Sequence, residues 1–275
     1  MCIVIAKTRR RDRCEGGGRQ IRGSLAMSVR FLSISLMFLL FFMWCGSRYD
    51  PVPPKHVTIA KIDFAGVGGH HISTNIIYSV PQGYTPKKAF PVVIALHGSG
   101  SNAAAFHDLW KTVTDTSGFV LLTPQGEEKT EENIGWRWGE NAERSVLVGL
   151  DILRKAVHVD PKRIYIVGFS SGGRLAYYMG LRHSNLFKGI AALGAPVDKR
   201  ILSEKFIVNR GVKVYIGHGS LEGGIAEDTE VAVKKFRELG VEPKYVRYEG
   251  IGHSLPDPME SEMKRILDYL DSGAR

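Results

Sequence analysis

The sequence predicts an α/β fold, a three-layer sandwich built on a mostly parallel sheet, and two observations carry this prediction. Strand-like and helix-like segments alternate along the chain from about residue 55 onward. Several strand-like segments, such as VVIAL and YIVGF, are nearly continuous apolar runs, which is typical of parallel strands covered on both faces. All three cysteines lie within the first 45 residues, so the folded part needs no disulfide and offers no thiolate metal site.

Apolar patterns and the turn residues between them place the elements in order. The first two strands have no helix between them, so we expect an antiparallel hairpin around Gly68 and Gly69 at the edge of the sheet. The expected strands span residues 56–64, 74–80, 92–97, 119–123, 163–169, 189–193, 212–217 and 244–249, and the expected helices span 103–116, 142–157, 172–182, 228–239 and 258–270.

Most of the net charge of +9 lies in the first 47 residues, which carry eight basic residues against Asp12 and Glu15. The rest of the chain is only mildly basic, so the charge favours a leader over a nucleic-acid-binding face. After the basic stretch, residues 31–45 (FLSISLMFLLFFMWC) carry no charge, and Cys45 is followed by Gly46 and Ser47. A basic stretch, an apolar run and small residues after it are typical of a secretory signal.

Three roles stay open for this segment: a cleaved secretory signal, a retained N-terminal anchor, and lipid attachment at Cys45. The start also stays open, since Met27 would itself begin a conventional signal. We expect a leader over residues 1–47, a proline-rich linker over 48–54 and one domain over 55–275. The protein is then expected to be secreted, periplasmic or anchored, with membrane contact only through its N-terminal segment.

The most informative stretch reads RIYIVGFSSGGRLAYYM and begins at Arg163. It places Gly168, Ser170 and Gly172 in a Gly-x-Ser-x-Gly pattern between a buried strand and a helix. A sharp strand-to-helix turn exposes the serine hydroxyl, and the glycines leave room for a strained backbone. This context predicts Ser170 as a nucleophile, although the bare pattern also arises by chance in a chain with 31 glycines.

A second buried strand ends in the turn His97-Gly98-Ser99-Gly100. Such a turn can present a backbone N–H, from Gly98 or Ser99, opposite the N–H of Ser171. Together these donors would form an oxyanion hole. The alternative is that the turn merely joins strand to helix. His97 comes too early in the chain order to be the base, so we expect it to be structural.

Two later loops supply an acid and a base. Glu222 follows strand 212–217 in the sequence HGSLE, and His253 follows strand 244–249 in the sequence GIGHS. The order serine, acid, histidine, each after a further strand, is the order that this arrangement uses. A lone loop histidine is more often a surface residue than a catalyst, but this one comes where the other elements require a base.

Asp228 and Asp198 are rivals of Glu222 for the acid. Asp228 is better explained as an early residue of helix 228–239, where a negative charge complements the helix dipole. Asp198 follows strand 189–193, from which an acid could also reach the base. The extra methylene of Glu222 demands a slightly retracted backbone, which the two glycines after it permit.

The stretch from about residue 74 to 270 resembles the α/β-hydrolase superfamily. It is similar to small bacterial esterases of the polyhydroxybutyrate-depolymerase and feruloyl-esterase type and to phospholipase/carboxylesterase-type proteins. The resemblance implies Ser170 as nucleophile, His253 as base and Glu222 as acid, a position where these relatives more often carry Asp. The sequences that carry it are ALHGSG (95–100), GWRWGE (135–140), VDPKRIYIVGFSSGGRLAYYM (159–179), HGSLE (218–222) and GIGHS (250–254).

These residues predict a serine esterase that works through a Ser-His-Glu triad and an acyl-enzyme. This chemistry needs no metal or organic cofactor, and no cluster of histidines and acids has ligand spacing. The expected partner is an ester, small or polymer-derived, and not a nucleic acid. Two alternatives stay open: a serine peptidase or thioesterase on the same scaffold, and an inactive binding protein of the same fold.

The substrate pocket is expected to be open. Only about 18 residues separate strand 189–193 from Val212, and a cap domain would need many more. Trp136 and Trp138 lie in a loop that could form a wall of this pocket. Equally, the two indoles could pack under that loop.

Overall fold

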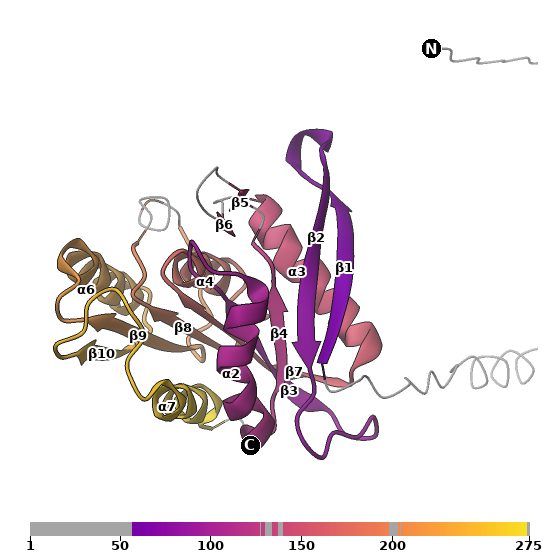
Figure 1. Cartoon of the computed structure of the whole chain (residues 1–275). Helices are drawn as coiled ribbons and strands as arrows, with labels where there is room; N and C mark the ends of the chain where they lie inside the picture. The colour runs from indigo at the N-terminus through magenta and orange to yellow at the C-terminus, as the bar shows by residue number, and fades with distance from the viewer. Residues whose placement is uncertain are drawn as a thin grey trace, which may run out of the picture. The chain divides into compact units, whose positions relative to one another are not determined.

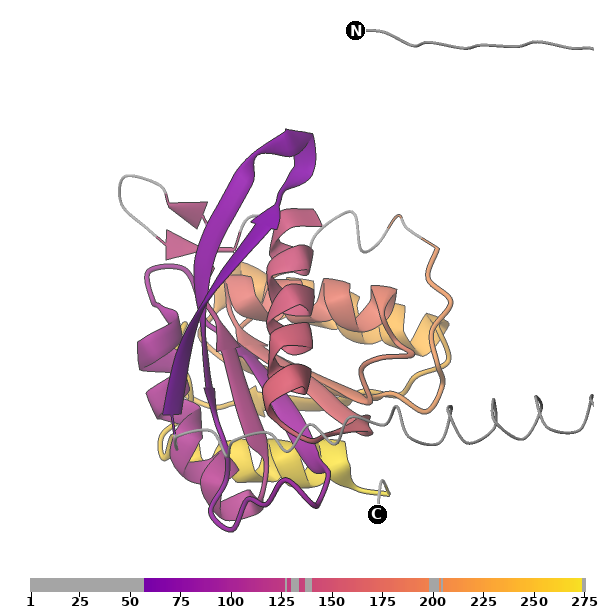
Figure 2. The same cartoon turned by 90° about the vertical axis from the view of Figure 1, so that its right-hand side faces the viewer.

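The computed structural model describes residues 57–126, 128–129, 134–136, 140–197, 203 and 205–273 of the chain. The predicted leader, the linker and residues 31–45 lie outside these ranges. The described part forms one eight-stranded sheet with helices on both of its faces (Figures 1 and 2). This is the predicted three-layer α/β sandwich, and within the described residues it carries no large cap domain.

The sheet has the strand order β1-β2-β4-β3-β7-β8-β9-β10. Strand β2 pairs antiparallel with β1 and β4, and every other neighbouring pair is parallel. The strands are β1 Val57–Ala65, β2 His71–Ser79, β3 Phe90–Leu96, β4 Val120–Pro124, β7 Val159–Phe169, β8 Gly189–Leu193, β9 Lys213–Gly219 and β10 Lys244–Tyr248. A separate two-stranded sheet pairs β5 Glu128–Lys129 with β6 Ile134–Gly135.

Five α-helices cover the large sheet among the described residues. They are α2 Ala103–Ser117, α3 Glu140–Ala156, α4 Ser171–Arg182, α6 Gly223–Glu238 and α7 Met259–Asp271. The central strand β3 is buried along its whole length, and its side chains alternate between two cores. Val92 and Ile94 face the core under α3, α4 and α6, whereas Val93 and Ala95 face the core under α2 and α7.

The predicted edge hairpin is confirmed by the antiparallel register of β1 and β2. Its tip holds a short 3-10 turn at Val67–Gly69. Because Ile76 pairs with Pro124 at the end of β4, residues 71–75 extend past β4 together with their partners in β1, and Figure 1 shows the hairpin tip at the top of the picture. The Val67 N–H donates to the Asn141 side chain at 2.8 Å, which ties the tip to α3.

Every predicted strand and helix is present within a few residues, with one correction. Helix α6 begins at Gly223 and not at 228, because the chain turns into the helix directly after Glu222, where Gly223 adopts a φ of +38°. Asp228 therefore lies in the second turn of α6 and is not an early helix residue. Its carboxylate accepts a hydrogen bond from the Val197 N–H at 3.3 Å. The short strands β5 and β6 were not predicted.

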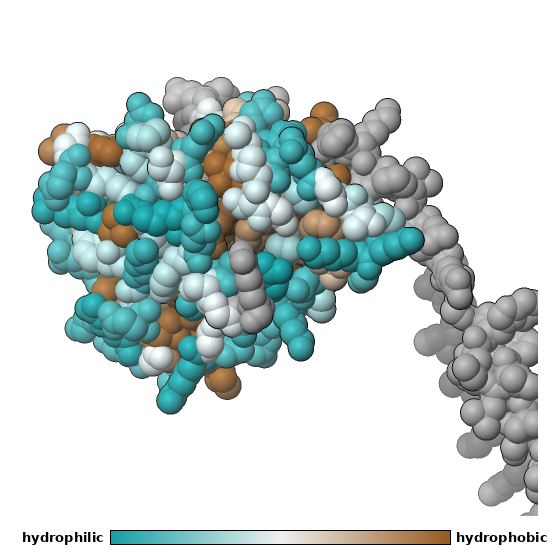
Figure 3. Space-filling view, turned by 90° about the horizontal axis from the view of Figure 1, so that it is seen from below, coloured by the Kyte–Doolittle hydropathy of each residue, from teal (hydrophilic) through white to brown (hydrophobic). Residues whose placement is uncertain are grey.

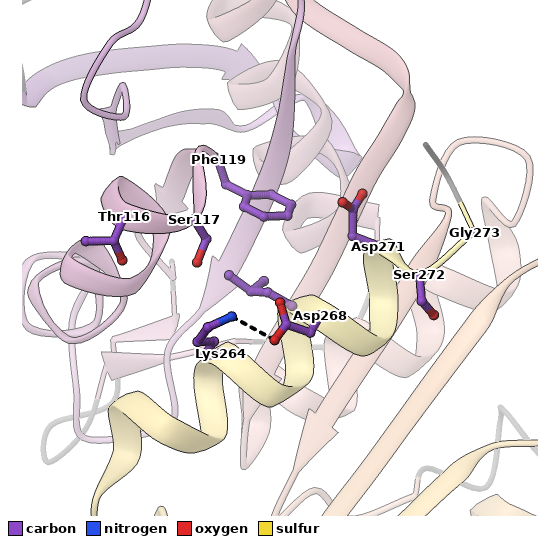
Figure 4. A pocket seen from close by; sticks show the side chains of 9 residues that line it. Thr116, Ser117, Phe119, Lys264, Asp268, Asp271, Ser272 and Gly273 are labelled. Carbon is purple, nitrogen blue, oxygen red and sulfur yellow. Dashed lines mark hydrogen bonds and ion pairs between the residues drawn. The ribbon is translucent and has the colours of Figure 1, made fainter.

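The face seen from below in Figure 3 is mostly hydrophilic, with hydrophobic residues in small separate patches. A cavity of about 490 Å³ opens between the C-terminal ends of α2 and α7 (Figure 4). Its walls include Phe119, Asp271 and the ion-paired Lys264 and Asp268. No helix in the described part of the chain is long and apolar enough to cross a membrane.

Candidate active site

Ser170 lies at the sharp turn between β7 and α4. Its φ of 53° and ψ of −120° fall in a region that side chains with a Cβ rarely adopt. Among the described residues it is the one non-glycine residue with positive φ. The Ser170 N–H donates to the Leu193 carbonyl at 2.9 Å, which anchors the strained turn to β8. This is the predicted strand-to-helix elbow.

Two glycines make the elbow sterically possible. A Cβ on Gly168 would lie 2.3 Å from the Gly172 carbonyl oxygen, and a Cβ on Gly172 would lie 2.2 Å from the Leu96 carbonyl oxygen. Real Cβ atoms do not approach backbone oxygens this closely, so both positions require glycine. The first turn of α4 thereby packs directly against the end of β3.

The structure brings Ser170, His253 and Glu222 into one hydrogen-bonded chain. The Nε2 atom of His253 lies 2.9 Å from the Ser170 Oγ, and its Nδ1 is hydrogen-bonded to the Glu222 Oε1. A carboxylate only accepts hydrogen bonds, so Nδ1 carries the proton and Nε2 is free to accept one from the hydroxyl. Sequence reasoning named all three residues.

These three side chains differ in their exposure to solvent. The Glu222 side chain is 1% exposed, whereas the His253 side chain is 47% exposed. The second carboxylate oxygen of Glu222 accepts a hydrogen bond from the Gly219 N–H. The acid is therefore buried and fully engaged, while the imidazole reaches the surface where a substrate can meet it.

The loops that carry the acid and the base are joined by backbone hydrogen bonds. The Ser220 N–H donates to the Tyr248 carbonyl at 2.8 Å, and the Leu221 N–H donates to the Ile251 carbonyl at 2.9 Å. The Gly250 N–H donates to the Ser220 Oγ, also at 2.8 Å. These bonds join the two loops, so the backbone as well as the side chains sets the distance between Glu222 and His253.

Two neighbours of the triad escaped the sequence analysis. The Phe169 ring stacks on the His253 imidazole, with 5.0 Å between centroids. A Cβ on Gly194, which has a φ of +50°, would lie 2.9 Å from the Glu222 Oε1 and 3.0 Å from the Phe169 ring. Both residues come from the ends of strands that the pattern located, but only the packing of the sheet reveals their contact with the triad.

The turn after β3 lies against the nucleophile, as the oxyanion-hole prediction requires. A Cβ on Gly98 would lie 3.3 Å from the Ser170 Cβ. Ser171, the other predicted donor, is the first residue of α4, so its N–H belongs to the unpaired first turn of a helix. The Gly98 turn and the first residue of α4 thus both border Ser170, and that their N–H groups serve as the oxyanion hole stays a prediction.

The other residues that the sequence analysis singled out, where the structure describes them, are not part of this hydrogen-bonded chain. Trp136 is buried, 2% exposed, and its indole N–H donates to the His97 carbonyl at 2.9 Å. Of the two interpretations, packing under the loop describes Trp136, because a buried indole cannot form a wall open to solvent. Trp138 and Asp198 lie outside the described residues. His97 is fully buried, and burial lowers the pKa of its imidazole.

The acid follows β9 and the base follows β10, while the serine follows β7. One strand, β8, therefore intervenes between the strand of the nucleophile and the strand of the acid. In the part of the chain that the structure covers, no three histidine, cysteine, aspartate or glutamate side chains are grouped as metal ligands. The cavity of Figure 4 involves none of the three triad residues.

Two family models match the chain. Residues 140–272 match the phospholipase/carboxylesterase family, and residues 75–204 match the polyhydroxybutyrate-depolymerase esterase family. Among curated proteins, a poly(3-hydroxybutyrate) depolymerase of Ralstonia pickettii is 28% identical over 150 residues, which cover 47% of this chain and 30% of that protein. A bifunctional acetylxylan esterase/xylanase of Neocallimastix patriciarum is 29% identical over 214 residues, which cover 66% of this chain and 31% of that protein.

The chain thus spans about a third of the length of these curated relatives. A solved structure of a ferulic acid esterase superposes with a TM-score of 0.61 at 16% identity, covering 78% of this chain and 98% of the other. That likeness concerns the fold. The two family matches, each over just under half of the chain, and the names of the relatives support an esterase of the α/β-hydrolase type.

Proposed function

We propose that the protein is a serine hydrolase that cleaves carboxylic esters through Ser170, His253 and Glu222. One observation carries the proposal: a hydrogen-bonded chain runs from a buried carboxylate through an imidazole to a serine held in a strained elbow. Nucleophile, base and orienting acid in this geometry are what acyl transfer requires. The names of the relatives favour an ester as the acyl donor.

In the first half of the reaction, the His253 Nε2 accepts the hydroxyl proton as the Ser170 Oγ attacks the ester carbonyl carbon. The carbonyl oxygen becomes negatively charged, and the N–H groups of Ser171 and of Ser99 or Gly98 stabilise it. Glu222 stabilises the imidazolium and keeps its tautomer. The imidazolium then protonates the alcohol oxygen, the C–O bond breaks, and an acyl-enzyme remains on Ser170.

In the second half, water replaces the alcohol. His253 takes a proton from the water, whose oxygen attacks the acyl carbon. The second tetrahedral intermediate collapses as the imidazolium returns this proton to the Ser170 Oγ. The carboxylic acid leaves, and the hydroxyl and the neutral imidazole are restored. Every proton is supplied by the hydroxyl, the imidazole or water, so this chain's own residues account for both steps.

Hydrolysis of short-acyl p-nitrophenyl esters by the purified chain from residue 48 tests the proposal. We expect turnover by the wild type and a loss of at least about 10³-fold for Ser170→Ala, with unchanged circular dichroism. Ser254→Ala is the matched control, because it removes an exposed hydroxyl next to His253 and should retain activity. Wild-type turnover by Ser170→Ala would exclude Ser170 as the nucleophile.

A substrate panel separates the proposal from its alternatives. The same triad can serve a thioesterase or a peptidase, because all three reactions pass through an acyl-enzyme. We expect p-nitrophenyl esters to give a higher kcat/KM than acyl-CoA thioesters or aminoacyl amides. A preference for thioesters or amides would reassign the substrate class and keep the triad. No turnover and no label from a fluorophosphonate would favour the inactive binding protein.

We also propose that residues 31–45 direct the protein into the cell envelope or out of the cell. The uncharged run behind a basic leader supports this. Cell fractionation of the full chain and of a chain that starts at residue 48 compares the two fates. A full-length soluble cytoplasmic product of the first would overturn the proposal.

A further inference from the structure

The turn between β3 and α2 has two consecutive carbonyl groups held by buried side chains. The His97 carbonyl accepts a hydrogen bond from the Trp136 indole at 2.9 Å. The Gly98 carbonyl accepts one from the His97 Nδ1 at 2.9 Å and a second from the Ser101 N–H at 3.2 Å. Both side chains are at most 2% exposed. Loops usually leave such carbonyls to water, so this turn is held unusually firmly.

The hydrogen-bond partners of His97 determine its tautomer. The Gly126 backbone N–H, which can only donate, lies 3.0 Å from the His97 Nε2. Nε2 is therefore the acceptor, and the proton resides on Nδ1, which donates to the Gly98 carbonyl. Gln125 agrees with this: its Oε1 accepts from the Ala103 N–H at 2.8 Å, which turns its amide N–H toward the His97 Nε2 at 3.2 Å.

Holding these carbonyls also aims the N–H groups of the same peptides. A trans peptide is planar, with its C=O and N–H pointing in opposite directions. Fixing the His97 carbonyl fixes the direction of the Gly98 N–H, and fixing the Gly98 carbonyl fixes that of the Ser99 N–H. A Cβ on Gly98 would lie 3.3 Å from the Ser170 Cβ, so this turn borders the nucleophile.

We propose that Trp136 and His97 are positioning residues that orient the two backbone N–H donors of the Gly98–Ser99 turn toward the acyl oxygen. The inference rests on the proposed function and deepens it. An oxyanion hole lowers the barrier only if its donors already point at the developing charge. Trp136 and His97 are buried, and in this proposal they act through the peptides that they hold.

A pair of tryptophan variants tests the role of Trp136. Trp136→Phe removes the indole N–H and keeps an aromatic ring. Trp110→Phe is the control, because Trp110 is 1% exposed and its Nε1 has no hydrogen-bond partner among the described residues. Both substitutions leave a similar gap in the core. We expect kcat for p-nitrophenyl esters to fall about 10- to 100-fold for Trp136→Phe with KM unchanged, and to stay near wild type for Trp110→Phe.

A pair of histidine variants tests the second residue. The asparagine amide can stand where the His97 Nδ1 lies and still donate to the Gly98 carbonyl. The glutamine amide reaches the place of Nε2, so its oxygen accepts from the Gly126 N–H, but the Gly98 carbonyl loses its side-chain donor and keeps only the Ser101 N–H. We expect His97→Asn to retain at least about 10-fold more kcat than His97→Gln. This order distinguishes positioning from packing, since glutamine is closer to histidine in size.

A trifluoromethyl ketone supplies a readout that a purely structural role would not move. Its adduct with Ser170 places a negative oxygen in the oxyanion hole, so its inhibition constant should rise by the same factor as kcat/KM falls in Trp136→Phe and His97→Gln. Equal constants for Trp136→Phe and Trp110→Phe, together with equal kcat for His97→Asn and His97→Gln, would overturn the inference. If either pair fails to fold, the other pair decides.

Failure of the proposed function gives a different result. A fluorophosphonate that leaves wild-type Ser170 unlabelled would overturn both the proposed function and this inference. Labelling of Ser170 at equal rates in Trp136→Phe, His97→Gln and the wild type would overturn the inference alone. Labelling that is about 10-fold slower in these two variants, but not in Trp110→Phe, supports it.

Discussion

Glu222 and Glu262 are both buried glutamates beside the same half of the sheet, with 8% and 6% of the whole residue exposed. The Glu262 Oε1 accepts hydrogen bonds from the Tyr215 and Tyr248 hydroxyls, and its other oxygen pairs with Arg265. Burial raises the pKa of both phenols, so they remain protonated donors. None of these three partners passes the interaction on to an accessible nucleophile, and we call such a cluster closed.

Glu222 differs in what its partner does next. The His253 Nδ1 is hydrogen-bonded to the carboxylate, and its Nε2 lies 2.9 Å from the Ser170 Oγ. Asp271, which borders the cavity of Figure 4, repeats the closed pattern with Arg163 and Tyr165. Burial and charge are thus shared by the structural carboxylates and by the proposed triad acid. An open chain that leads from the carboxylate to an accessible nucleophile sets Glu222 apart.

The largest effect is expected for Glu222→Gln. The neutral amide no longer stabilises the imidazolium, and its NH₂ group can select the wrong tautomer of His253. We expect kcat for p-nitrophenyl esters to fall by about 10²- to 10⁴-fold. Asp228→Asn and Asp198→Asn should be nearly silent. If kcat fell in Asp228→Asn or Asp198→Asn and not in Glu222→Gln, the role of the acid would have to be reassigned.

A pH titration probes a buried histidine that no catalytic chain uses. Burial lowers the pKa of His107 to about 4. Between its unfolded value near 6.5 and this value, the unfolded chain binds a proton that the folded chain does not, so the free energy of unfolding should fall as the pH falls. The shift corresponds to no more than about 3 kcal/mol.

Urea unfolding between pH 7 and pH 4 measures this loss. His107→Asn should flatten the decline, because asparagine does not titrate and can still bond to the Thr123 hydroxyl, which lies 2.9 Å from the His107 Nδ1. His70→Asn, at an exposed position on the hairpin tip, is the control and should keep the wild-type slope. Equal slopes for the two variants would show that His107 does not cause the decline.

The closed cluster should matter for stability and not for turnover. Glu262→Gln keeps an acceptor for one tyrosine but loses the charge opposite Arg265 and leaves a buried amide imperfectly paired. We expect the free energy of unfolding to drop by about 2 kcal/mol, while kcat per folded molecule stays within about two-fold of wild type. A fall in kcat as large as that of Glu222→Gln would erase the distinction between open and closed carboxylates.

The smallest effect is expected for Gly194→Ala. A Cβ there meets both a positive φ and the Glu222 carboxylate, 2.9 Å away. Gly118→Ala has a φ of +79° but no heavy atom within 4 Å of its new Cβ, so it isolates the backbone cost. Both should lose about 1–2 kcal/mol of stability. Only Gly194→Ala should also lower kcat, and equal kcat in both would mean that the carboxylate tolerates the methyl group.

The sequence predicted the large sheet well because buried parallel strands have an unambiguous pattern. VVIAL, YIVGF and VKVYI are apolar on both faces and lie between glycine-rich or polar turns. The three residues of the proposed triad were predicted for a related reason. Each follows such a strand, and the carboxyl ends of parallel strands meet at one edge, so locating the strands brings Ser170, Glu222 and His253 together.

The features that could not be predicted from the sequence depend on contacts between distant segments. The five residues from Gly223 to Glu227 look like a glycine-rich loop, yet they open α6. The Ile225 N–H donates to the Glu222 carbonyl in this first turn, despite the weak helix propensity of the two glycines. No local pattern distinguishes a buried Trp136 from an exposed one, or reveals that Gly194 and Phe169 border the triad. These facts follow from strand order, which the sequence does not specify directly.

Mass spectrometry of the fluorophosphonate-treated protein is the most direct test of the central claim. A fluorophosphonate reacts only with a serine activated by a base, so the predicted result is one adduct, on the peptide that contains Ser170. Labelling should be lost in Ser170→Ala, slowed at least about 100-fold in Glu222→Gln and unchanged in Glu262→Gln. An adduct on another serine, or equal slowing by the two glutamate variants, would contradict the account.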